Sequence, residues 1–317
     1  MSALPLISVV LPTYNRAGTL PRAIRGVLSQ SFDDLELIVV DDASTDNTAE
    51  VVLGFKDARI RYLPSQERLG VSRARNLGIE NALGTYVAFQ DSDDEWRVEK
   101  LEKQMLAFQQ GGPDIVLVAC GDLVLNHYPM SYLGVASDEA VVDITVMSSL
   151  RMPPAPCWIV SKEALLKTGG FNEQLNCFED WELSLRLSET GRILMVNEPY
   201  TLRHRTPNSL FSTEKNYIPN LKYILDRHHE RLVKHPQVWA FYCNLIGQTE
   251  CQYGSSQEGR SWFVQALSAR PLSLRTWVNL ACSLFGASVF KTYVAWARKA
   301  KSQYSAPVRA ALYLGDR

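Results

Sequence analysis

The sequence predicts an α/β protein with a mostly parallel central sheet, flanking helices and an all-α C-terminal region. Apolar runs of strand length recur in the first half of the chain, at 6–11, 35–40, 59–63 and 86–90. They are rich in Val, Ile and Leu and show little polar alternation, which is typical of strands buried on both faces of a sheet. Helical stretches separate the runs, and an alternation of strands and helices indicates a parallel sheet.

The helical stretches in this first half are 17–31, 44–55 and 70–83. Each connects two successive strands, so each is expected to be a right-handed crossover. Beyond residue 111 the alternation is less regular. Two further strands are expected there, at 114–120 and 155–161.

A Pro-containing loop is expected between these two strands, at about 126–156. The segment 178–191 has apolar residues at helical spacing and predicts a helix. From about 212 the pattern is helical to the end, so the predicted domains are 1–211 and 212–317.

The C-terminal domain carries a faint repeat signal. Gly247, Phe263, Ala266 and Pro271 fall at positions that resemble one tetratricopeptide unit, and the alternative is an ordinary helical bundle. Residues 287–317 contain six Lys and Arg and one acidic residue, Asp316. This segment is compatible with a solvated basic helix face, with a partner contact, or with peripheral contact to an anionic membrane.

Composition narrows the functional classes. The formal net charge of the 317 residues is −1, so a nucleic-acid partner is not expected. The six cysteines include no CxxC pair, which disfavours a zinc site and predicts reduced thiols in a cytoplasmic protein. No window reaches the roughly 18 to 20 apolar residues of a membrane span. The run at 6–11 has no basic region before it and predicts a strand rather than a signal peptide.

Groups of mainly polar residues follow three of the predicted strands at the point where each strand ends. They are Pro12, Thr13, Tyr14 and Asn15 after the first, Asp41 and Asp42 after the second, and Asp91 and Asp93 after the fourth. Ligands of parallel α/β sheets bind at the carboxyl ends of the strands. These groups are therefore expected to converge on one edge of the sheet.

The stretch DSDDE at 91–95 gathers four acidic residues in five positions. Asp91 and Asp93 point to the same side of an extended segment, so both can face one divalent cation. The alternative is a solvated turn in which Asp94 caps a helix that begins near Trp96.

The segments SVVLPTYNRAGTLPRAIRGVLSQSFDDLELIVVDDASTDNT (8–48) and GVSRARNLGIENALGTYVAFQDSDDEW (70–96) resemble the family 2 glycosyltransferases of the GT-A fold. The resemblance covers residues 6–206. It implies a Rossmann-like GT-A domain that transfers a sugar, with inversion, from a nucleotide-diphosphate sugar to a hydroxyl acceptor. It also implies Mn²⁺ or Mg²⁺ as cofactor.

By this resemblance Asp93 is the direct metal ligand, Asp91 lies toward the ribose or sugar hydroxyls of the donor or a metal-bound water, and Ser92 contacts the donor. Asp42 is expected to accept the imide N–H of a uracil ring, which favours a UDP-sugar, while Tyr14 stacks on the ring. The alternative for Asp41 and Asp42 is a plain strand end.

Arg73 and Arg75 are candidates for the diphosphate, because guanidinium groups match phosphate geometry. One of the two is expected only to pack or to form a surface ion pair. His204 is assigned a metal or phosphate role.

The segment GGFNEQLNCFEDWELSLRL (169–187) resembles the acceptor loop of the family. Asp180 is therefore the expected general base for the acceptor hydroxyl, with Glu179 as its neighbour. A structural alternative is that Asp180 caps a helix that starts at Trp181.

Two other classes compete with this interpretation. A phosphatase of the haloacid-dehalogenase type would use Asp91 and Asp93, but its motif normally follows the first strand of the domain. An inactive, transferase-like interaction protein would lack the acids that are present here. The expected partners are the sugar nucleotide and a carbohydrate or lipid-linked acceptor of polysaccharide, lipopolysaccharide or glycoconjugate synthesis. The expected location is the cytoplasm, with peripheral contact at the inner face of the membrane.

Overall fold

A computed structural model of the protein describes residues 4–125, 131–133, 152–204 and 217–297. The contacts of the chain divide it into two compact units, Met1–Leu210 and Phe211–Arg317, and each is considered by itself. Most of the loop expected at 126–156 and most of the basic segment at 287–317 lie outside the described residues.

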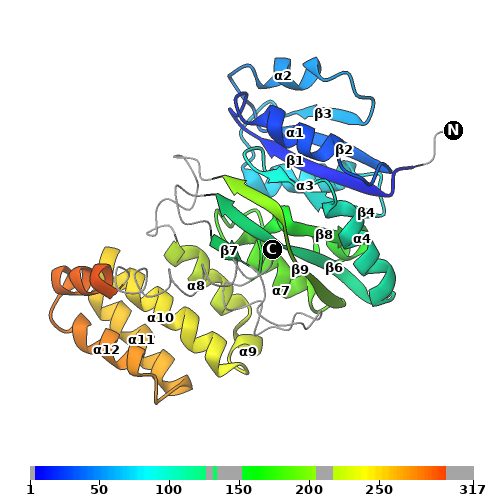
Figure 1. The fold of residues 1–317 in the computed structure, drawn as a ribbon. Helices are drawn as coiled ribbons and strands as arrows, with labels where there is room; N and C mark the ends of the chain where they lie inside the picture. Colours follow the sequence, from blue (N-terminus) through cyan, green and yellow to red (C-terminus); the bar gives the residue numbers. More distant parts are fainter. Residues whose placement is uncertain (1–3, 126–130, 134–151, 205–216, 298–317) are drawn as a thin grey trace, which may run out of the picture. The chain divides into compact units, whose positions relative to one another are not determined.

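The first unit is built on one nine-stranded sheet (Figure 1). Its strands are β1 (Ile7–Thr13), β2 (Leu35–Asp41), β3 (Ile60–Pro64), β4 (Tyr86–Phe89), β5 (Glu95–Trp96), β6 (Ile115–Leu125), β7 (Ser131–Leu133), β8 (Trp158–Ser161) and β9 (Arg192–His204). They follow the order β3-β2-β1-β4-β8-β6-β9-β5, and β7 pairs with β6. The half formed by β3, β2, β1 and β4 is parallel throughout, which confirms the predicted α/β class.

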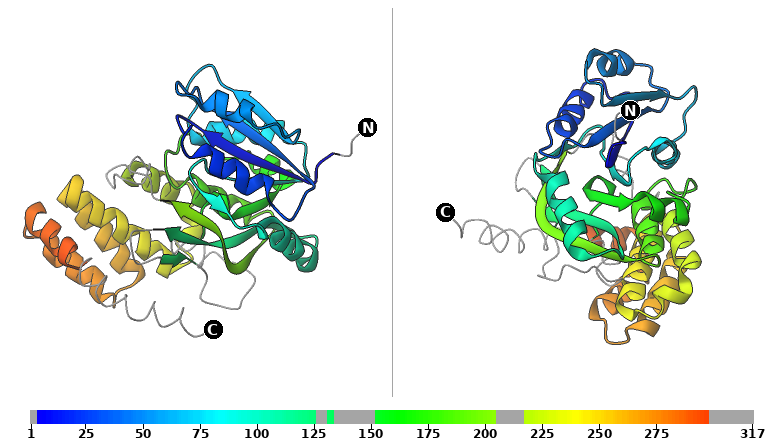
Figure 2. Two further views of the ribbon diagram at one scale, coloured as in Figure 1. Left: turned by 45° about the horizontal axis from the view of Figure 1, so that its top comes forward. Right: turned by 90° about the vertical axis from the view of Figure 1, so that its right-hand side faces the viewer.

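Helices cover both faces of this sheet (Figure 2). They are α1 (Leu20–Leu28), α2 (Thr48–Gly54), α3 (Val71–Asn81), α4 (Lys100–Gly111), α6 (Lys162–Thr168) and α7 (Glu179–Leu187). Alternate residues of a strand point to opposite faces. Accordingly Val9 of β1 packs in the core with α1, α2 and α4, whereas Val10 faces Gly78 of α3, where a Cβ would lie 2.3 Å from a Val10 methyl.

The second half of the sheet differs from the simple alternation. The strand β8 is antiparallel to β4 and β6, whereas β9 is parallel to β6. The sequence pattern did not predict the 13-residue strand β9, which carries His204 to the same edge as the ends of β1, β2 and β4. The short 3-10 helix η2 (Ala155–Cys157) leads into β8.

The prediction that a helix begins near Trp96 is wrong. Glu95 and Trp96 instead form β5, which pairs antiparallel with β9. The next helix, α4, begins only at Lys100. Trp96 is 3% exposed and lies in the core, where its indole N–H donates to the carbonyl of Pro156 at 3.0 Å. Asp94 therefore caps no helix.

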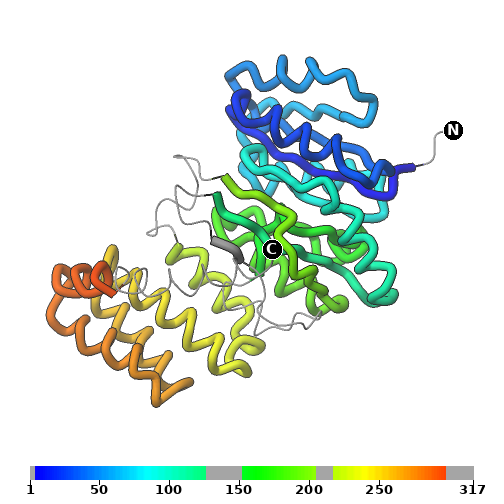
Figure 3. Tube along the Cα trace, in the orientation of Figure 1, coloured from blue at the N-terminus to red at the C-terminus, as the bar shows by residue number. Residues whose placement is uncertain are grey.

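The second unit is helical in its described part (Figure 3). Its helices are α8 (Tyr217–Arg227), α9 (His229–Leu232), α10 (Pro236–Tyr253), α11 (Ser256–Ala269) and α12 (Leu274–Ser283), and residues 287–297 are also helical. The helices α10 and α11 approach closely where Gly247 meets Phe263 and Gly259. None of the described helices is both long and apolar enough to cross a membrane.

Candidate active site at the carboxyl edge of the sheet

The loops after β1 and β2 are tied together by Asn15. This residue has a left-handed backbone, with φ of 49°, a conformation that Asn tolerates better than most residues. Its side-chain oxygen accepts the backbone N–H of Thr45 at 2.7 Å, and its own N–H donates to the Ser44 hydroxyl at 2.9 Å. The polar residues after these two strands are thereby held in one loop cluster.

The carboxylate of Asp42 is buried and is held by the turn after β3. It accepts the backbone N–H groups of Leu69 at 2.5 Å and Gly70 at 3.1 Å, and also Nε of Arg68 at 3.1 Å. The guanidinium carbon of Arg68 lies 3.3 Å from the centroid of the Tyr14 ring. Tyr14 and Asp42, the two residues expected to hold a base, thus share Arg68 as a partner. No pattern in the sequence pointed to Arg68.

Asp41 has a different environment from Asp42. It accepts the hydroxyl of Tyr62 at 2.5 Å and the backbone N–H of Ser44 at 3.0 Å. Burial, together with this bond to Asp41, raises the pKa of Tyr62. Asp41 thus fixes β3 and the loop after β2.

The DSDDE stretch folds into a tight turn after β4, in which the N–H of Asp94 donates to the carbonyl of Asp91 at 3.2 Å. The side chains of Asp91 and Asp93 remain 33% and 22% exposed, whereas Ser92 and Asp94 are buried. Two arginines that were not singled out from the sequence contact Asp93. Arg16 lies 3.7 Å from its carboxylate, and Arg22 donates to its carbonyl at 2.5 Å.

The carboxyl group of Asp94 shows how much negative charge this turn gathers. Burial, and then the charges of Asp91 and Asp93, raise the pKa of Asp94 well above its usual value, while Arg203 acts in the opposite direction. Asp94 accepts the backbone N–H of His204 at 3.0 Å. The His204 ring is held beside Glu95, with its Nε2 3.5 Å from the carboxylate. His204 therefore lies against the acidic turn.

Arg75 of α3 joins the acidic turn to α7. Its guanidinium donates to Asp91 at 2.9 Å and to Glu179 at 2.8 Å. Burial alone would lower the pKa of Arg75, but the charges of Asp91 and Glu179 raise it instead. Only 5% of this side chain is exposed, and two carboxylates already engage it. Its expected contact with a diphosphate stays a prediction.

Other residues of α3 hold the loop that precedes α7. Asn76 accepts the N–H of Phe171 at 2.8 Å and donates to the carbonyl of the same residue at 2.9 Å. Arg73, the other diphosphate candidate, instead pairs with Glu80 at 2.7 Å and approaches Glu173 at 3.5 Å. Gly170 has φ of +70°, and a Cβ there would lie 2.5 Å from Asn76 Oδ1. The glycine lets the loop approach α3.

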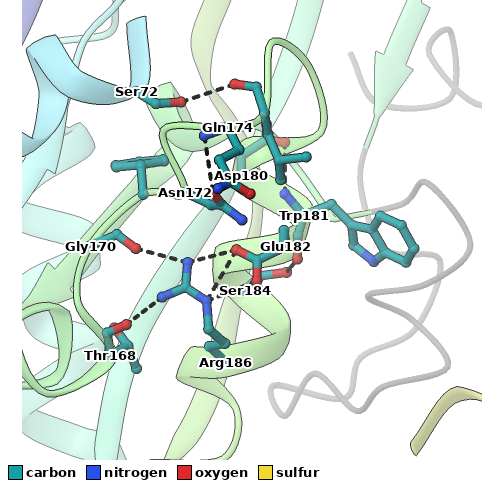
Figure 4. Close-up of polar contacts among 12 residues, drawn as sticks. Ser72, Thr168, Gly170, Asn172, Gln174, Asp180, Trp181, Glu182, Ser184 and Arg186 are labelled. Carbon is teal, nitrogen blue, oxygen red and sulfur yellow. Dashed lines mark hydrogen bonds and ion pairs between the residues drawn. The ribbon is translucent and has the colours of Figure 1, made fainter. Parts of the chain in front are cut away.

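The other side of this loop is fixed by α7 (Figure 4). Arg186 forms a bidentate ion pair with the fully buried Glu182 and donates to the carbonyls of Thr168 and Gly170. Figure 4 shows Asp180 at the start of the helix.

Asp180 is the second residue of α7. The helix begins at Glu179, after Phe178 in a left-handed conformation with φ of 61°, so it starts two residues earlier than the capping alternative expected. The contact that this alternative expected is nevertheless present, because the carboxylate of Asp180 accepts the backbone N–H of Trp181 at 2.7 Å. Burial, and then the charge of Glu179, raise the pKa of Asp180 to about 6, with Arg75 acting in the opposite direction. A carboxylate with this pKa is well suited to accept a proton near neutral pH.

The acidic turn offers oxygen ligands to a divalent cation. Within the described residues no group of three or more His, Cys, Asp or Glu is arranged to hold a metal ion. Mg²⁺ is commonly bound by one or two carboxylates together with phosphates of the substrate. The residues present therefore fit an ion that is bound together with a diphosphate.

Comparison with known proteins agrees with this arrangement. A family model described as glycosyl transferase family 2 matches residues 8–131. The glycosyltransferase GlyG of Streptococcus pneumoniae is 37% identical over 229 residues, which are 66% of this chain and 74% of that protein. The UDP-Glc:alpha-D-GlcNAc-diphosphoundecaprenol beta-1,3-glucosyltransferase WfgD of Escherichia coli is 39% identical over 163 residues, 47% of this chain and 64% of that protein.

The putative teichuronic acid biosynthesis glycosyltransferase TuaG of Bacillus subtilis is 44% identical over 103 residues, 32% of this chain. The matches to TuaG and WfgD span 41% and 64% of the length of those proteins.

Two solved structures are similar in fold at 18% sequence identity. Staphylococcus aureus TarS 1-349 in complex with UDP-GlcNAc has a TM-score of 0.66, with 93% of this chain and 92% of that chain covered. The mannosyltransferase PcManGT from Pyrobaculum calidifontis, in complex with GDP-Man and Mn²⁺, has a TM-score of 0.57, with coverage of 99% and 89%.

Proposed function

The chain belongs to glycosyl transferase family 2 and has the GT-A type of fold, and from this premise we propose that it is an inverting transferase that uses a UDP-sugar. The observation that carries the proposal is the double ion pair of Arg75, which joins Asp91 of the acidic turn to Glu179, the neighbour of Asp180. The buried guanidinium of Arg75 thereby connects the acid expected at the donor to the neighbour of the candidate base.

In the proposed reaction Asp42 and Tyr14 hold the base of the donor, and Asp91 contacts its sugar. The carboxylate of Asp180 accepts the proton of the acceptor hydroxyl while that oxygen attacks the anomeric carbon. The bond from that carbon to the diphosphate breaks, and UDP leaves with the bonding electron pair. Attack on the face opposite the leaving group inverts the anomeric configuration.

A divalent cation, held by Asp93 with Asp91 or His204, would supply charge neutralisation for the departing diphosphate. Arg16 and Arg22 add positive charge beside Asp93. We propose Mn²⁺ or Mg²⁺ in this role. The PcManGT structure, which is a complex with GDP-Man and Mn²⁺, supports the proposal by analogy.

The proposed acceptor is a carbohydrate or a lipid-linked sugar. The WfgD name describes an acceptor on diphosphoundecaprenol, and by analogy we propose a cytoplasmic enzyme that works at the membrane surface in polysaccharide, lipopolysaccharide or glycoconjugate synthesis. The helical second unit, 212–317, is proposed as a separate domain, with the tetratricopeptide-like arrangement as one alternative.

The proposal is tested by a screen of nucleotide sugars with and without Mn²⁺. Release of the nucleoside diphosphate and thermal stabilisation are the two readouts. We expect a UDP-sugar to stabilise the protein and to be hydrolysed slowly without acceptor. Phosphate release from a simple phosphomonoester, with no response to any sugar nucleotide, would favour the phosphatase alternative instead.

Replacing Asp93 tests the proposed metal site. We expect Asp93→Asn to lower transfer by about 10²-fold, because loss of the cation removes several kcal/mol of charge stabilisation. The additional thermal stabilisation that Mn²⁺ confers on the UDP complex should also be lost. Asp33→Asn is the matched control, since the side chain of Asp33 is 91% exposed. An undiminished Mn²⁺ effect in Asp93→Asn would remove Asp93 from the site.

Arg68 is expected to compete with the base of the donor. Its guanidinium occupies a face of Tyr14 and one acceptor position of Asp42, the two contacts proposed for uracil. The side chain of Arg68 is 53% exposed, so the contacts that must break are worth about 1 to 2 kcal/mol together. We expect Arg68→Met to bind UDP about five- to thirtyfold more tightly in calorimetry. Weaker binding would show instead that Arg68 stays on the bound base.

A further inference from the structure

Charge is distributed unevenly along the chain. Residues 259–315 contain eight Lys and Arg and no Asp or Glu, although the whole chain has a net charge of −1. The basic residues are Arg260, Arg270, Arg275, Lys291, Arg298, Lys299, Lys301 and Arg309. Of those that the structure describes, Arg270, Arg275 and Lys291 are exposed. In the described part of this range the exposed ionisable side chains are therefore all positive.

The helix α12 packs on the bundle with several polar residues among those that it buries. Thr276, Asn279 and Ser283 are buried, with at most 1% exposed. Asn244 of α10 donates to the Thr276 hydroxyl at 2.7 Å and accepts from the Asn279 amide at 3.2 Å. Leu280 and Cys282 of the same helix are partly buried and pack against the apolar cluster of Cys251, Phe263, Phe290 and Val294. The inner face of α12 is therefore held by hydrogen bonds as well as by apolar contacts.

The opposite side of α12 is apolar and exposed. Leu274, Trp277 and Val278 are 76%, 52% and 36% exposed, and Leu284 and Phe285 continue the row with 68% and 73%. Leu274, Trp277 and Val278 lie three and four residues apart on one helix face. Leu284 and Phe285 follow Trp277 and Val278 by seven residues, in the turn directly after the helix ends at Ser283. These five residues are the apolar stripe of α12. Of the eighteen large hydrophobic residues that are exposed in the described part of the chain, eight lie between 272 and 296, so the stripe is a concentrated feature.

The charge around the stripe selects its partner. A second copy of this chain would bring two positive surfaces together, which disfavours self-association through this face. A bilayer that contains anionic phospholipid offers negative charge at its surface and an apolar interior directly beneath. Exposed Trp, Phe and Leu side chains flanked by Lys and Arg are the pattern of helices that lie in a membrane interface.

We propose that the apolar stripe of α12 docks on a bilayer containing anionic phospholipid. Leu274, Trp277, Leu284 and Phe285 enter the boundary between headgroups and acyl chains, and Arg275 and Lys291 meet the lipid phosphates. The purpose of this contact, access to a lipid-linked acceptor, rests on the proposed function. The contact itself does not.

The test is flotation of the full chain with lipid vesicles, without donor or acceptor. We expect binding to vesicles in which a third of the phosphatidylcholine is replaced by phosphatidylglycerol, little binding to phosphatidylcholine alone, and a decrease at high salt. The double variant Leu284→Ser/Phe285→Ser should bind the anionic vesicles at least about tenfold more weakly, because two exposed apolar side chains no longer enter the bilayer.

The matched control is Leu53→Ser/Leu166→Ser, which makes the same kind of change at side chains 62% and 57% exposed in the first unit. It should bind vesicles as the unchanged protein does. Circular dichroism must show both variants folded, which is expected because all four positions are exposed. Arg275→Glu/Lys291→Glu should reduce the preference for anionic lipid.

Three results would overturn the proposal. The first is equal binding of the stripe variant and its control, the second is equal binding to neutral and anionic vesicles, and the third is a dimer in light scattering that Leu284→Ser/Phe285→Ser converts to a monomer. Since no sugar nucleotide is present, failure here is distinguishable from failure of the proposed glycosyl transfer.

Discussion

The Asp180→Asn variant is expected to lose about 10³-fold in kcat while it binds UDP with nearly unchanged affinity. Asn has almost the same shape as Asp but cannot accept the proton of the acceptor hydroxyl, and a general base contributes about 10²- to 10⁴-fold. The measurement is single-turnover transfer with the donor found in the sugar-nucleotide screen, together with UDP binding by calorimetry.

Asp33→Asn serves again as the control for this experiment, because it makes the same chemical change on the surface. Transfer by Asp180→Asn within a few-fold of the unchanged protein would remove Asp180 from the role of base. A simultaneous loss of UDP binding would mean that the substitution disturbed the donor site, and the proposed separation of roles would then be wrong.

The pH dependence of transfer gives a second readout of the same residue. Burial foremost, and then Glu179, raise the pKa of Asp180 to about 6. Only the ionised carboxylate accepts a proton, so kcat should fall about tenfold per pH unit below this value and stay level above it. The residual kcat of Asp180→Asn should not show this decrease at low pH, which is the acidic limb of the pH profile. A limb near the usual pKa of an aspartate, about 4, would contradict the environment described for Asp180.

The parallel half of the sheet was predictable because its signals are local. β1, β2, β3 and β4 each coincide with an apolar run, and the run and the polar residues after it follow from a few adjacent positions. The placement of the DSDDE turn at a strand end follows in the same way. Asn15 and Asp42 come together simply because parallel strands end at one edge.

The second half of the sheet depends on pairing between distant segments. Glu95 and Trp96 are strand residues only because β9 lies beside them, and their local sequence reads equally well as the start of a helix. The antiparallel insertion of β8 between β4 and β6 has the same origin. Such pairings have no signature in a single stretch of sequence.

The arginines illustrate the same limit in the site. Arg75 contacts Asp91 and Glu179, which are 16 and 104 residues away, and Arg68 contacts Asp42 across 26. A motif shows that an arginine is present near a strand end, but its partner decides whether it meets a phosphate or a carboxylate. The inner and outer faces of α12 were hidden for a related reason, because Thr276, Asn279 and Ser283 are buried while large apolar residues of the same helix are exposed.

Arg75→Met is expected to destabilise the first unit by about 3 to 5 kcal/mol, the usual cost of removing one partner from a buried ion pair. Asp91 and Glu179 would lose their shared counter-ion, and a thioether offers neither charge nor hydrogen bonds. Urea unfolding, followed by intrinsic fluorescence, measures the change. Arg73→Met is the matched control on the same helix. Its ion pairs are exposed, so its cost should be below about 1 kcal/mol.

A second readout separates a positioning role of Arg75 from mere stabilisation. Arg75 lowers the pKa of Asp180, against burial and Glu179, so its removal should move the acidic limb of kcat to higher pH. Arg75→Lys keeps the charge but cannot reach both carboxylates in the same fork. In Arg75→Lys the position of the acidic limb should therefore return closer to that of the unchanged protein than the free energy of unfolding does. Both the loss of stability and the shift of the acidic limb are expected from the loss of the same guanidinium. If Arg75→Met is as stable as Arg73→Met and its acidic limb lies at the same pH as in the unchanged protein, the link between Asp91 and Glu179 does not organise this site.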